Sequence, residues 1–157
     1  VGFKYIGPMM QKEDALIGGE ESGGFAFRSH IPERDGILSS LFLLELLAKT
    51  GKSISQLLDQ LYDRFGTYHY DRVDLHLSDN IKHSLIQRIT TDPPKKLSGR
   101  LVCKFDTTDG LRFEFRDGSW LLLRFSGTEP LMRIYAESTD IVSVRKLLKA
   151  GRNLAGV

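Results

Sequence analysis

Three short strand-like segments joined by turns constrain the fold of this chain most strongly. They span residues 100–105, 111–116 and 120–125. The turns between them contain Asp109-Gly110 and Asp117-Gly118, and an Asp-Gly pair between alternating segments is a strong hairpin signal because both turn positions tolerate positive φ. The sequence therefore predicts an antiparallel sheet. Residues 68–77 alternate apolar with charged side chains and are predicted to form a strand, and residues 131–137 are predicted to add another.

Helix signals surround these strands. Asp35 precedes an apolar run at 37–44, which predicts a capped helix buried on most sides. Ser53 and Gln56 form a capping box before a helix that ends at Gly66. Two more helices are predicted, one starting at Ser78 and ending before Asp92-Pro93 and one capped by Asp140.

The order of these elements predicts an α+β fold with the helices packed on one face of the sheet. Residues 1–66 are glycine-rich and then helical, whereas residues 67–157 alternate short strands with turns. We therefore predict two domains that meet near Gly66. The chain opens on Val1 rather than methionine, so we expect it to be part of a longer protein.

The composition excludes several classes of protein. The 157 residues carry 22 Lys and Arg against 20 Asp and Glu, a net charge of +2, which disfavours a general nucleic-acid binder. The most apolar stretch falls short of the roughly 20 residues that span a bilayer. A single cysteine, Cys103, excludes an internal disulfide, and its apolar strand predicts that it lies in the core. The sequence predicts a cytoplasmic protein without a membrane partner.

The first candidate site is the glycine-rich segment at 18–24. Its glycines permit close backbone approach, while Glu20 and Ser22 offer oxygen atoms that suit sugar hydroxyls. A plain surface turn is the alternative explanation.

The second candidate site is the segment at 124–133, Arg-Phe-Ser-Gly-Thr-Glu-Pro-Leu-Met-Arg. Arg124 and Arg133 offer guanidinium forks for phosphate oxygens, and Gly127 lets backbone amides close on an anion between the hydroxyls of Ser126 and Thr128. A tight turn with two solvent-facing arginines is the alternative. The segment lacks the Gly-Lys-Ser/Thr ending of a Walker loop.

Three motifs together resemble the α-D-phosphohexomutase family of phosphoglucomutases and phosphomannomutases. They are Gly-Glu-Glu-Ser-Gly-Gly at 19–24, His-Ile-Pro-Glu-Arg-Asp-Gly at 30–36, and Arg-Phe-Ser-Gly-Thr-Glu-Pro at 124–130 with Arg133. The resemblance covers essentially the whole chain, but only the end of domain 3 and all of domain 4 of a four-domain architecture.

The resemblance implies interconversion of a hexose 1-phosphate and a hexose 6-phosphate. In this family a phosphoserine on domain 1 donates its phosphoryl group, a bisphosphorylated sugar such as glucose 1,6-bisphosphate forms, and domain 2 holds Mg²⁺. This chain contains neither the Ser-His-Asn/Asp-Pro nucleophile loop nor the Asp-Gly-Asp-x-Asp-Arg metal loop. We therefore expect no catalytic residue and no metal ligand in it, and no turnover without the N-terminal domains.

The resemblance also implies roles for single residues. Glu20 and Ser22 would bind sugar hydroxyls, and the phosphate ligands would be Arg124, Ser126, Gly127, Thr128 and Arg133. Further candidate substrate contacts are Arg34, Lys4 and His30. Gly24 stands where many relatives have histidine, so no histidine contact is available at that position.

The competing hypothesis is a non-catalytic module that binds phosphorylated ligands or RNA. It would use Arg124, Arg133 and the basic pair Lys95 and Lys96. A nucleic-acid groove would require aromatic side chains beside those cations, which disfavours this hypothesis.

Overall fold

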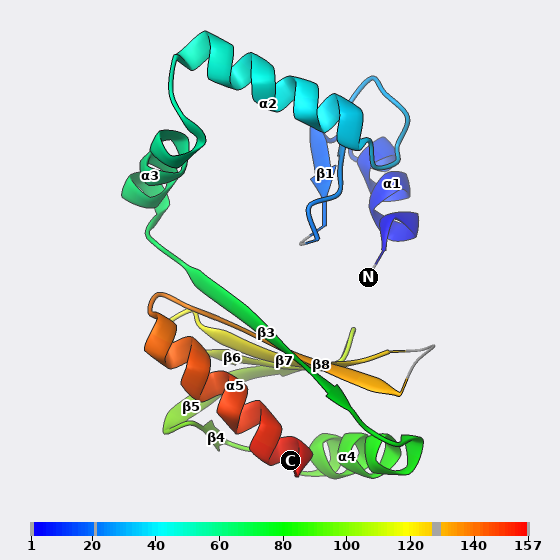
Figure 1. The fold of residues 1–157 in the computed structure, drawn as a ribbon. Coiled ribbons are helices and arrows are strands. Elements are labelled where there is room, and N and C mark those ends of the chain that lie inside the picture. The colour runs from blue at the N-terminus through cyan, green and yellow to red at the C-terminus, as the bar shows by residue number, and fades with distance from the viewer. Residues whose placement is uncertain (1, 21, 127–129, 157) are drawn as a thin grey trace. The chain divides into compact units, whose positions relative to one another are not determined.

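A computed structural model describes residues 2–20, 22–126 and 130–156. The chain forms two compact units, Val1–Gln60 and Leu61–Val157, which we call the N-terminal and C-terminal units. The elements of the N-terminal unit are α1 (Phe3–Lys12), β1 (Ile17–Gly19), β2 (Phe25–Phe27) and α2 (Gly36–Thr50), followed by α3 (Ile54–Phe65), within which the division falls. Figure 1 shows them in chain order.

The start of the N-terminal unit was not predicted. α1 has no side-chain cap at Gly2 and contains Pro8, so local preferences argue against a helix there. Packing outweighs them, because Phe3, Gly7 and Met10 share one face of α1 and are buried. β1 and β2 pair as an antiparallel hairpin with three residues in each strand. Strands this short show no alternation in the sequence.

The cap signals of the two longer helices are confirmed. The Asp35 carboxylate accepts a hydrogen bond from Leu38 N at 2.9 Å and begins α2. Gln56 N donates to Ser53 Oγ at 3.3 Å, while Ser53 N donates to Gln56 Oε1 at 2.8 Å, which completes the capping box of α3. Gly66 follows α3 with a φ of 87°, as a terminating glycine should.

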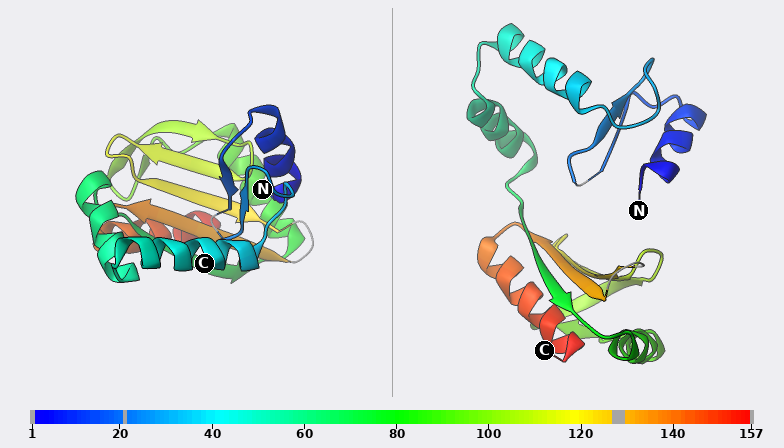
Figure 2. Two further views of the ribbon diagram at one scale, coloured as in Figure 1. Left: turned by 90° about the horizontal axis from the view of Figure 1, so that it is seen from above. Right: turned by 45° about the vertical axis from the view of Figure 1, so that its right-hand side comes forward.

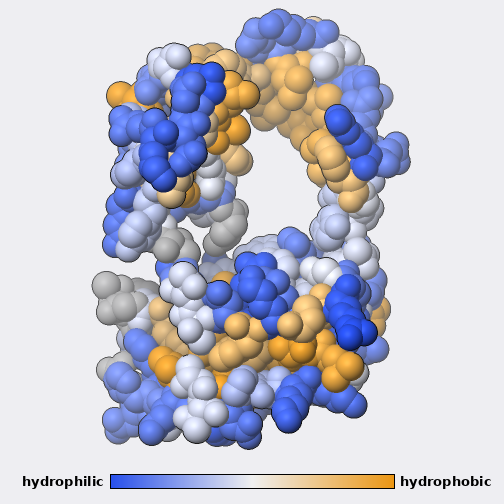
Figure 3. Space-filling view, turned by 180° about the vertical axis from the view of Figure 1, so that it is seen from behind, coloured by the Kyte–Doolittle hydropathy of each residue, from blue (hydrophilic) through white to orange (hydrophobic). Residues whose placement is uncertain are grey.

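The predicted burial of α2 is wrong. None of its side chains is buried, and Leu41 and Leu44 are 57% and 61% exposed. Phe42 packs against Phe27 of β2 with the ring centres 4.5 Å apart and the rings tilted, but a two-stranded hairpin is too small to cover an apolar helix. Orange patches of hydrophobic residues are visible on the molecular surface in Figure 3.

An exposed apolar helix predicts that the chain binds hydrophobic dyes and self-associates. Replacing Leu41 and Leu44 with glutamate should lower both dye fluorescence and the mass observed by light scattering. Leu101→Glu is the matched control, because Leu101 is 52% exposed on a strand of the other unit. A monomer that binds no dye at high concentration would contradict the exposure of α2.

The C-terminal unit is a six-stranded antiparallel sheet with two helices. Its elements are β3 (His69–His76), α4 (Asp79–Thr91), β4 (Lys96–Leu97), β5 (Arg100–Asp106), β6 (Leu111–Phe115), β7 (Trp120–Phe125), β8 (Leu131–Ser138) and α5 (Ile141–Ala155). The strand order is β3-β8-β7-β6-β5-β4, so the first strand of the unit pairs with the last. α4 and α5 lie on the same side of the sheet in both views of Figure 2, which confirms the predicted α+β arrangement.

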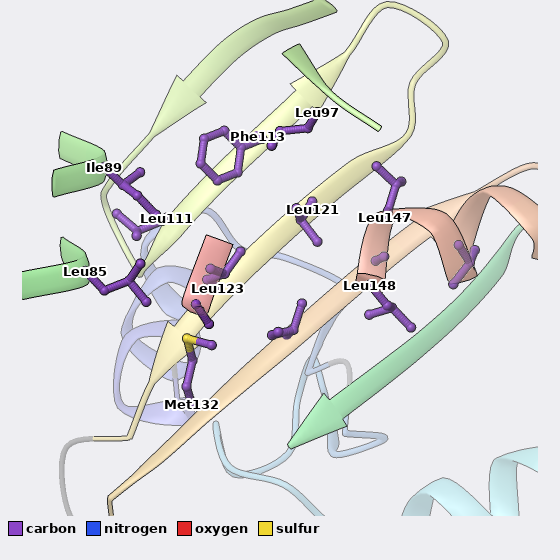
Figure 4. Packing of buried hydrophobic residues seen from close by; sticks show 14 of the residues in the cluster. Leu85, Ile89, Leu97, Leu111, Phe113, Leu121, Leu123, Met132, Leu147 and Leu148 are labelled. Carbon is purple, nitrogen blue, oxygen red and sulfur yellow. The ribbon is translucent and has the colours of Figure 1, made fainter. Parts of the chain in front are cut away.

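The core lies between this sheet face and the two helices. Alternate residues of β6, β7 and β8 are buried, among them Phe113, Leu121 and Ile134 at 0% exposure. Leu85 and Ile89 of α4 and residues of α5 complete the cluster, as Figure 4 shows. The opposite face of the same strands mixes charged and apolar side chains: Arg112, Arg124 and Arg133 lie there with Leu122, so the sheet presents these arginines on the face away from the helices.

Cys103 is exposed, which corrects the prediction that it lies in the core. It belongs to β5, where the register shifts between Val102 and Lys104 opposite β6. Such an irregularity breaks the alternation that would otherwise place the thiol by counting along the strand. The thiol contacts the carbonyl oxygen of Glu114 at 3.1 Å.

Candidate functional site

Glu20 and Ser22 lie in the turn between β1 and β2. Glu20 N donates to Gly24 O at 2.9 Å, and Gly23 N donates back to Glu20 O at 3.0 Å, which closes the turn. The Glu20 side chain is 11% exposed, whereas Ser22 is exposed. Gly18 and Gly19, predicted to be part of a loop, are strand residues instead. The turn therefore holds one sheltered carboxylate beside one accessible hydroxyl.

Arg34 is brought to Glu20 by the fold. Its Nη1 lies 3.2 Å from Glu20 Oε2, and its Nε lies 3.0 Å from Glu33 Oε1. The hydrogen bond to Glu33 and the charge of Glu20 raise the pKa of Arg34, so the guanidinium stays charged. A Cβ at position 24 would lie 2.5 Å from Arg34 Cδ. Glycine at 24 thus leaves the space through which Arg34 reaches Glu20.

The other two candidate contacts of this unit have different partners. His30 Nε2 lies 2.9 Å from Asp35 Oδ2, the same carboxylate that caps α2. The hydrogen bond from Leu38 N, followed by that from His30, lowers the pKa of Asp35. Lys4 is exposed on α1, with its ammonium 5.0 Å from the ring centre of Tyr5. His30 therefore supports the start of α2, while Lys4 remains accessible.

Arg124 and Arg133 face each other across β7 and β8. They are a register pair, and the β7–β8 loop (residues 126–130) begins two residues after Arg124. Ser126 N donates to Leu131 O at 2.8 Å and closes the base of this loop. The predicted ligands Gly127 and Thr128 lie outside the described residues. The structure thus places three of the five predicted phosphate ligands at one end of the same strand pair.

Each of these arginines has an aspartate beside it. Arg124 Nε lies 3.2 Å from Asp109 Oδ2, and Arg133 Nε lies 3.7 Å from Asp74 Oδ2. These contacts are ion pairs that lack hydrogen-bond alignment, since neither buried Nε has a hydrogen-bond partner. Two like charges directly opposite in a sheet repel each other, and the two aspartates offset that repulsion. Both arginines remain partly accessible to solvent, because the side chains of Arg124 and Arg133 are 27% and 31% exposed.

Sequence reasoning missed three residues around this loop: Asp74, Lys82 and Asp109. Asp109 was recognised only as a turn residue, and Asp74 only as a polar position of a strand. Lys82 of α4 donates to Ser126 O at 3.1 Å. Each meets its partner through the fold rather than through nearby sequence, so no local signal could have identified it.

Two further kinds of feature are clusters of metal-binding side chains and helices that span a membrane. Within residues 2–20, 22–126 and 130–156, no group of three or more His, Cys, Asp and Glu side chains could hold a metal ion. These side chains therefore do not fit the Mg²⁺ that the resemblance implies for the whole enzyme. Of the helices in the same ranges, none is both long enough and apolar enough to cross a bilayer.

Comparison with known families assigns both units. Residues 1–65 match the family described as phosphoglucomutase/phosphomannomutase, alpha/beta/alpha domain III. Residues 77–153 match the C-terminal domain of the same family. The chain belongs to the phosphoglucomutase/phosphomannomutase family and matches its domain III and its C-terminal domain over these residues.

Individual relatives agree with this assignment. A phosphoglucomutase/phosphomannomutase of Thermococcus kodakarensis is 32% identical over 98% of this chain, which spans 31% of that protein. A phosphoglucosamine mutase of Methanococcus maripaludis is 31% identical over 96% of this chain, and the chain spans 32% of that protein. A crystal structure assigned as a phosphomannomutase from Thermus thermophilus has a TM-score of 0.76 and 37% identity, with all of this chain and 30% of that one covered. The chain thus spans about a third of the length of these relatives.

Proposed function

We propose that this chain is the part of a phosphohexomutase that recognises the sugar and the non-reacting phosphate of its substrate. The parent enzyme would interconvert hexose 1-phosphate and hexose 6-phosphate in the cytoplasm through a phosphoserine and a bisphosphorylated intermediate such as glucose 1,6-bisphosphate. The observation that carries the proposal is the pair Arg124 and Arg133, which face each other beside the β7–β8 loop. The turn that holds Glu20 and Ser22 supplies the sugar contacts.

The chemistry of these residues fits such a division of labour. Paired guanidinium groups bind a phosphate dianion through several charge-assisted hydrogen bonds. Binding at a phosphate remote from the reacting bond orients the substrate and supplies energy that the reaction can use. A carboxylate and a hydroxyl on a short turn accept and donate hydrogen bonds to sugar hydroxyls without requiring one orientation of the ring.

The groups that transfer the phosphoryl group belong to the rest of the proposed enzyme. A phosphoserine and Mg²⁺ on other domains would supply the leaving phosphoryl group and neutralise its charge. Family names among the relatives include mutases of glucose, mannose and glucosamine phosphates. We propose a hexose or hexosamine phosphate as the substrate class.

The alternative module for RNA or other phosphorylated ligands is less well supported. Lys96 lies on β4, and β5 and β6 separate β4 from β7, so the basic pair does not extend the patch of Arg124 and Arg133. The one tryptophan of the sheet, Trp120, is covered by the Arg112 guanidinium at 4.9 Å and donates to Glu137. Its ring face is therefore already occupied by a side chain.

A ligand titration, monitored by the amide signals in NMR spectra of the chain, tests the proposal. Glucose 1,6-bisphosphate should shift the amide signals of Glu20 and Ser22 as well as that of Ser126, whereas a short oligonucleotide at equal phosphate concentration should not. The same purified chain should not interconvert glucose 1-phosphate and glucose 6-phosphate in a coupled assay that detects an added mutase. Shifts caused by the oligonucleotide alone would favour the RNA module, and turnover by the chain would refute its dependence on other domains.

A further inference from the structure

Lys82 joins α4 to the β7–β8 loop. It lies in the first turn of α4 and is half-buried. Its Nζ donates a hydrogen bond of 3.1 Å to the carbonyl oxygen of Ser126 and lies 5.9 Å from the ring centre of Phe125. The contact links residues 44 positions apart in the sequence. The ammonium group thus reaches the residue at which the loop begins.

Among the described residues, two backbone hydrogen bonds accompany the contact of Lys82 at the ends of the loop. Ser126 N donates to Leu131 O, and Leu77 N donates to Pro130 O at 3.0 Å. Leu77 and Lys82 both belong to the segment that runs from the end of β3 into α4. That segment therefore holds the first loop residue through a side chain and the last through the backbone.

The charge of Lys82 matters because of what it contacts. A carbonyl oxygen carries partial negative charge, which repels a phosphate group bound next to it. A hydrogen bond from an ammonium group fixes that oxygen and offsets its charge, and a charged donor makes a stronger bond than a neutral one. A lysine ammonium has three donors, so two remain after the bond to Ser126. The group also places a positive charge beside the loop.

We infer that Lys82 is a positioning residue for phosphate binding, which holds the backbone carbonyl group of Ser126 in place at the end of β7. The inference rests on the proposed function of Arg124 and Arg133. It goes beyond that function by assigning a role to a residue of α4 that belongs to none of the three sequence motifs.

Three variants of the chain test this role. Lys82→Met removes the ammonium but keeps a flexible apolar stem against Phe125, and Lys82→Arg restores a cation. Lys96→Met is the matched control, because Lys96 is exposed on β4. Two quantities are measured for each: hydrogen exchange of the Ser126 and Leu77 amides without ligand, and the affinity for glucose 1-phosphate and for inorganic phosphate.

We expect Lys82→Met to speed exchange of the Ser126 amide and to weaken glucose 1-phosphate binding by roughly tenfold, as the loss of one charged hydrogen bond predicts. Lys82→Arg should recover most of the affinity, and Lys96→Met should change neither quantity. Trp120 fluorescence establishes that each variant is folded. If Lys82→Met does not fold, Lys82→Gln, which keeps a neutral donor, takes its place in both measurements.

The outcomes separate this inference from the proposed function. Unchanged exchange and unchanged affinity in Lys82→Met overturn the inference. So does a loss of affinity that disappears at high salt with exchange unchanged, because a distant surface charge would act in that way. If the wild-type chain binds no phosphate while Lys82→Met exchanges faster, Lys82 anchors the loop and the proposed function is wrong.

Discussion

Replacing Arg124 with methionine is expected to weaken the binding of a hexose phosphate by about 100-fold. In the proposed site the guanidinium would contact the phosphate in a bidentate manner, and each charged hydrogen bond contributes about 1.5–3 kcal/mol. A tenfold change in affinity corresponds to about 1.4 kcal/mol, so the loss of two such bonds reaches at least this size. Isothermal titration of the chain with glucose 1,6-bisphosphate measures the change.

Arg116→Met is the matched control for this experiment. It removes the same charge from an exposed position of the same unit, in the turn between β6 and β7. Its affinity should stay within about twofold of the wild-type value, because an exposed charge is screened by salt. Arg124→Lys should be intermediate, since an ammonium keeps the charge without the planar fork. Equal affinities for Arg124→Met and Arg116→Met would remove Arg124 from the site.

The largest effect on stability is expected for Phe113→Ala. Phe113 is fully buried at the centre of the sheet and stacks on Phe105 at a ring distance of 4.9 Å. Truncating a buried phenylalanine costs about 3–5 kcal/mol, because the transfer energy is lost and a cavity remains. Trp120 is the only tryptophan of the chain and lies on β7. Its fluorescence during urea unfolding therefore reports on the C-terminal unit.

Leu101→Ala provides the reference for that measurement. Leu101 is 52% exposed on β5, so its truncation should change the free energy of unfolding by no more than about 0.5 kcal/mol. A similar shift of the urea midpoint in both variants would mean that Phe113 does not lie in the core. A change in the slope of the transition would instead indicate an altered unfolded state.

Features of the fold that depend on neighbouring residues were predictable from the sequence. Helix caps and tight turns depend only on residues a few positions away. The structure confirms the caps at Asp35 and Asp140 and the turns at the two Asp-Gly pairs. α1 was missed because Pro8 and an uncapped start conceal a helix that packing stabilises. The burial of α2 was overestimated because hydrophobicity alone does not say what covers a helix.

The candidate site follows the same rule. The motif residues Arg124 and Arg133 could be named as candidates because their side chains have a recognisable chemistry at a recognisable spacing. Asp74, Lys82 and Asp109 were not, because an aspartate or lysine in isolation carries no signal about its partner. Arg34 could be named beside Glu20 only from a family resemblance, and the structure adds the contact between the two charges.

The pairing of β3 with β8 has a consequence for the synthesis of the protein. His69 pairs with Ser138, so β3 leaves the ribosome long before its partner strand exists. The meander of β4, β5, β6 and β7 can form as the chain emerges, whereas the non-local pairing of β3 with β8 slows folding. Until residues 131–138 are translated, neither edge of β3 is paired, and other nascent chains can aggregate on it. A ribosome that stalls before Leu131 would release a chain that has no stable C-terminal unit.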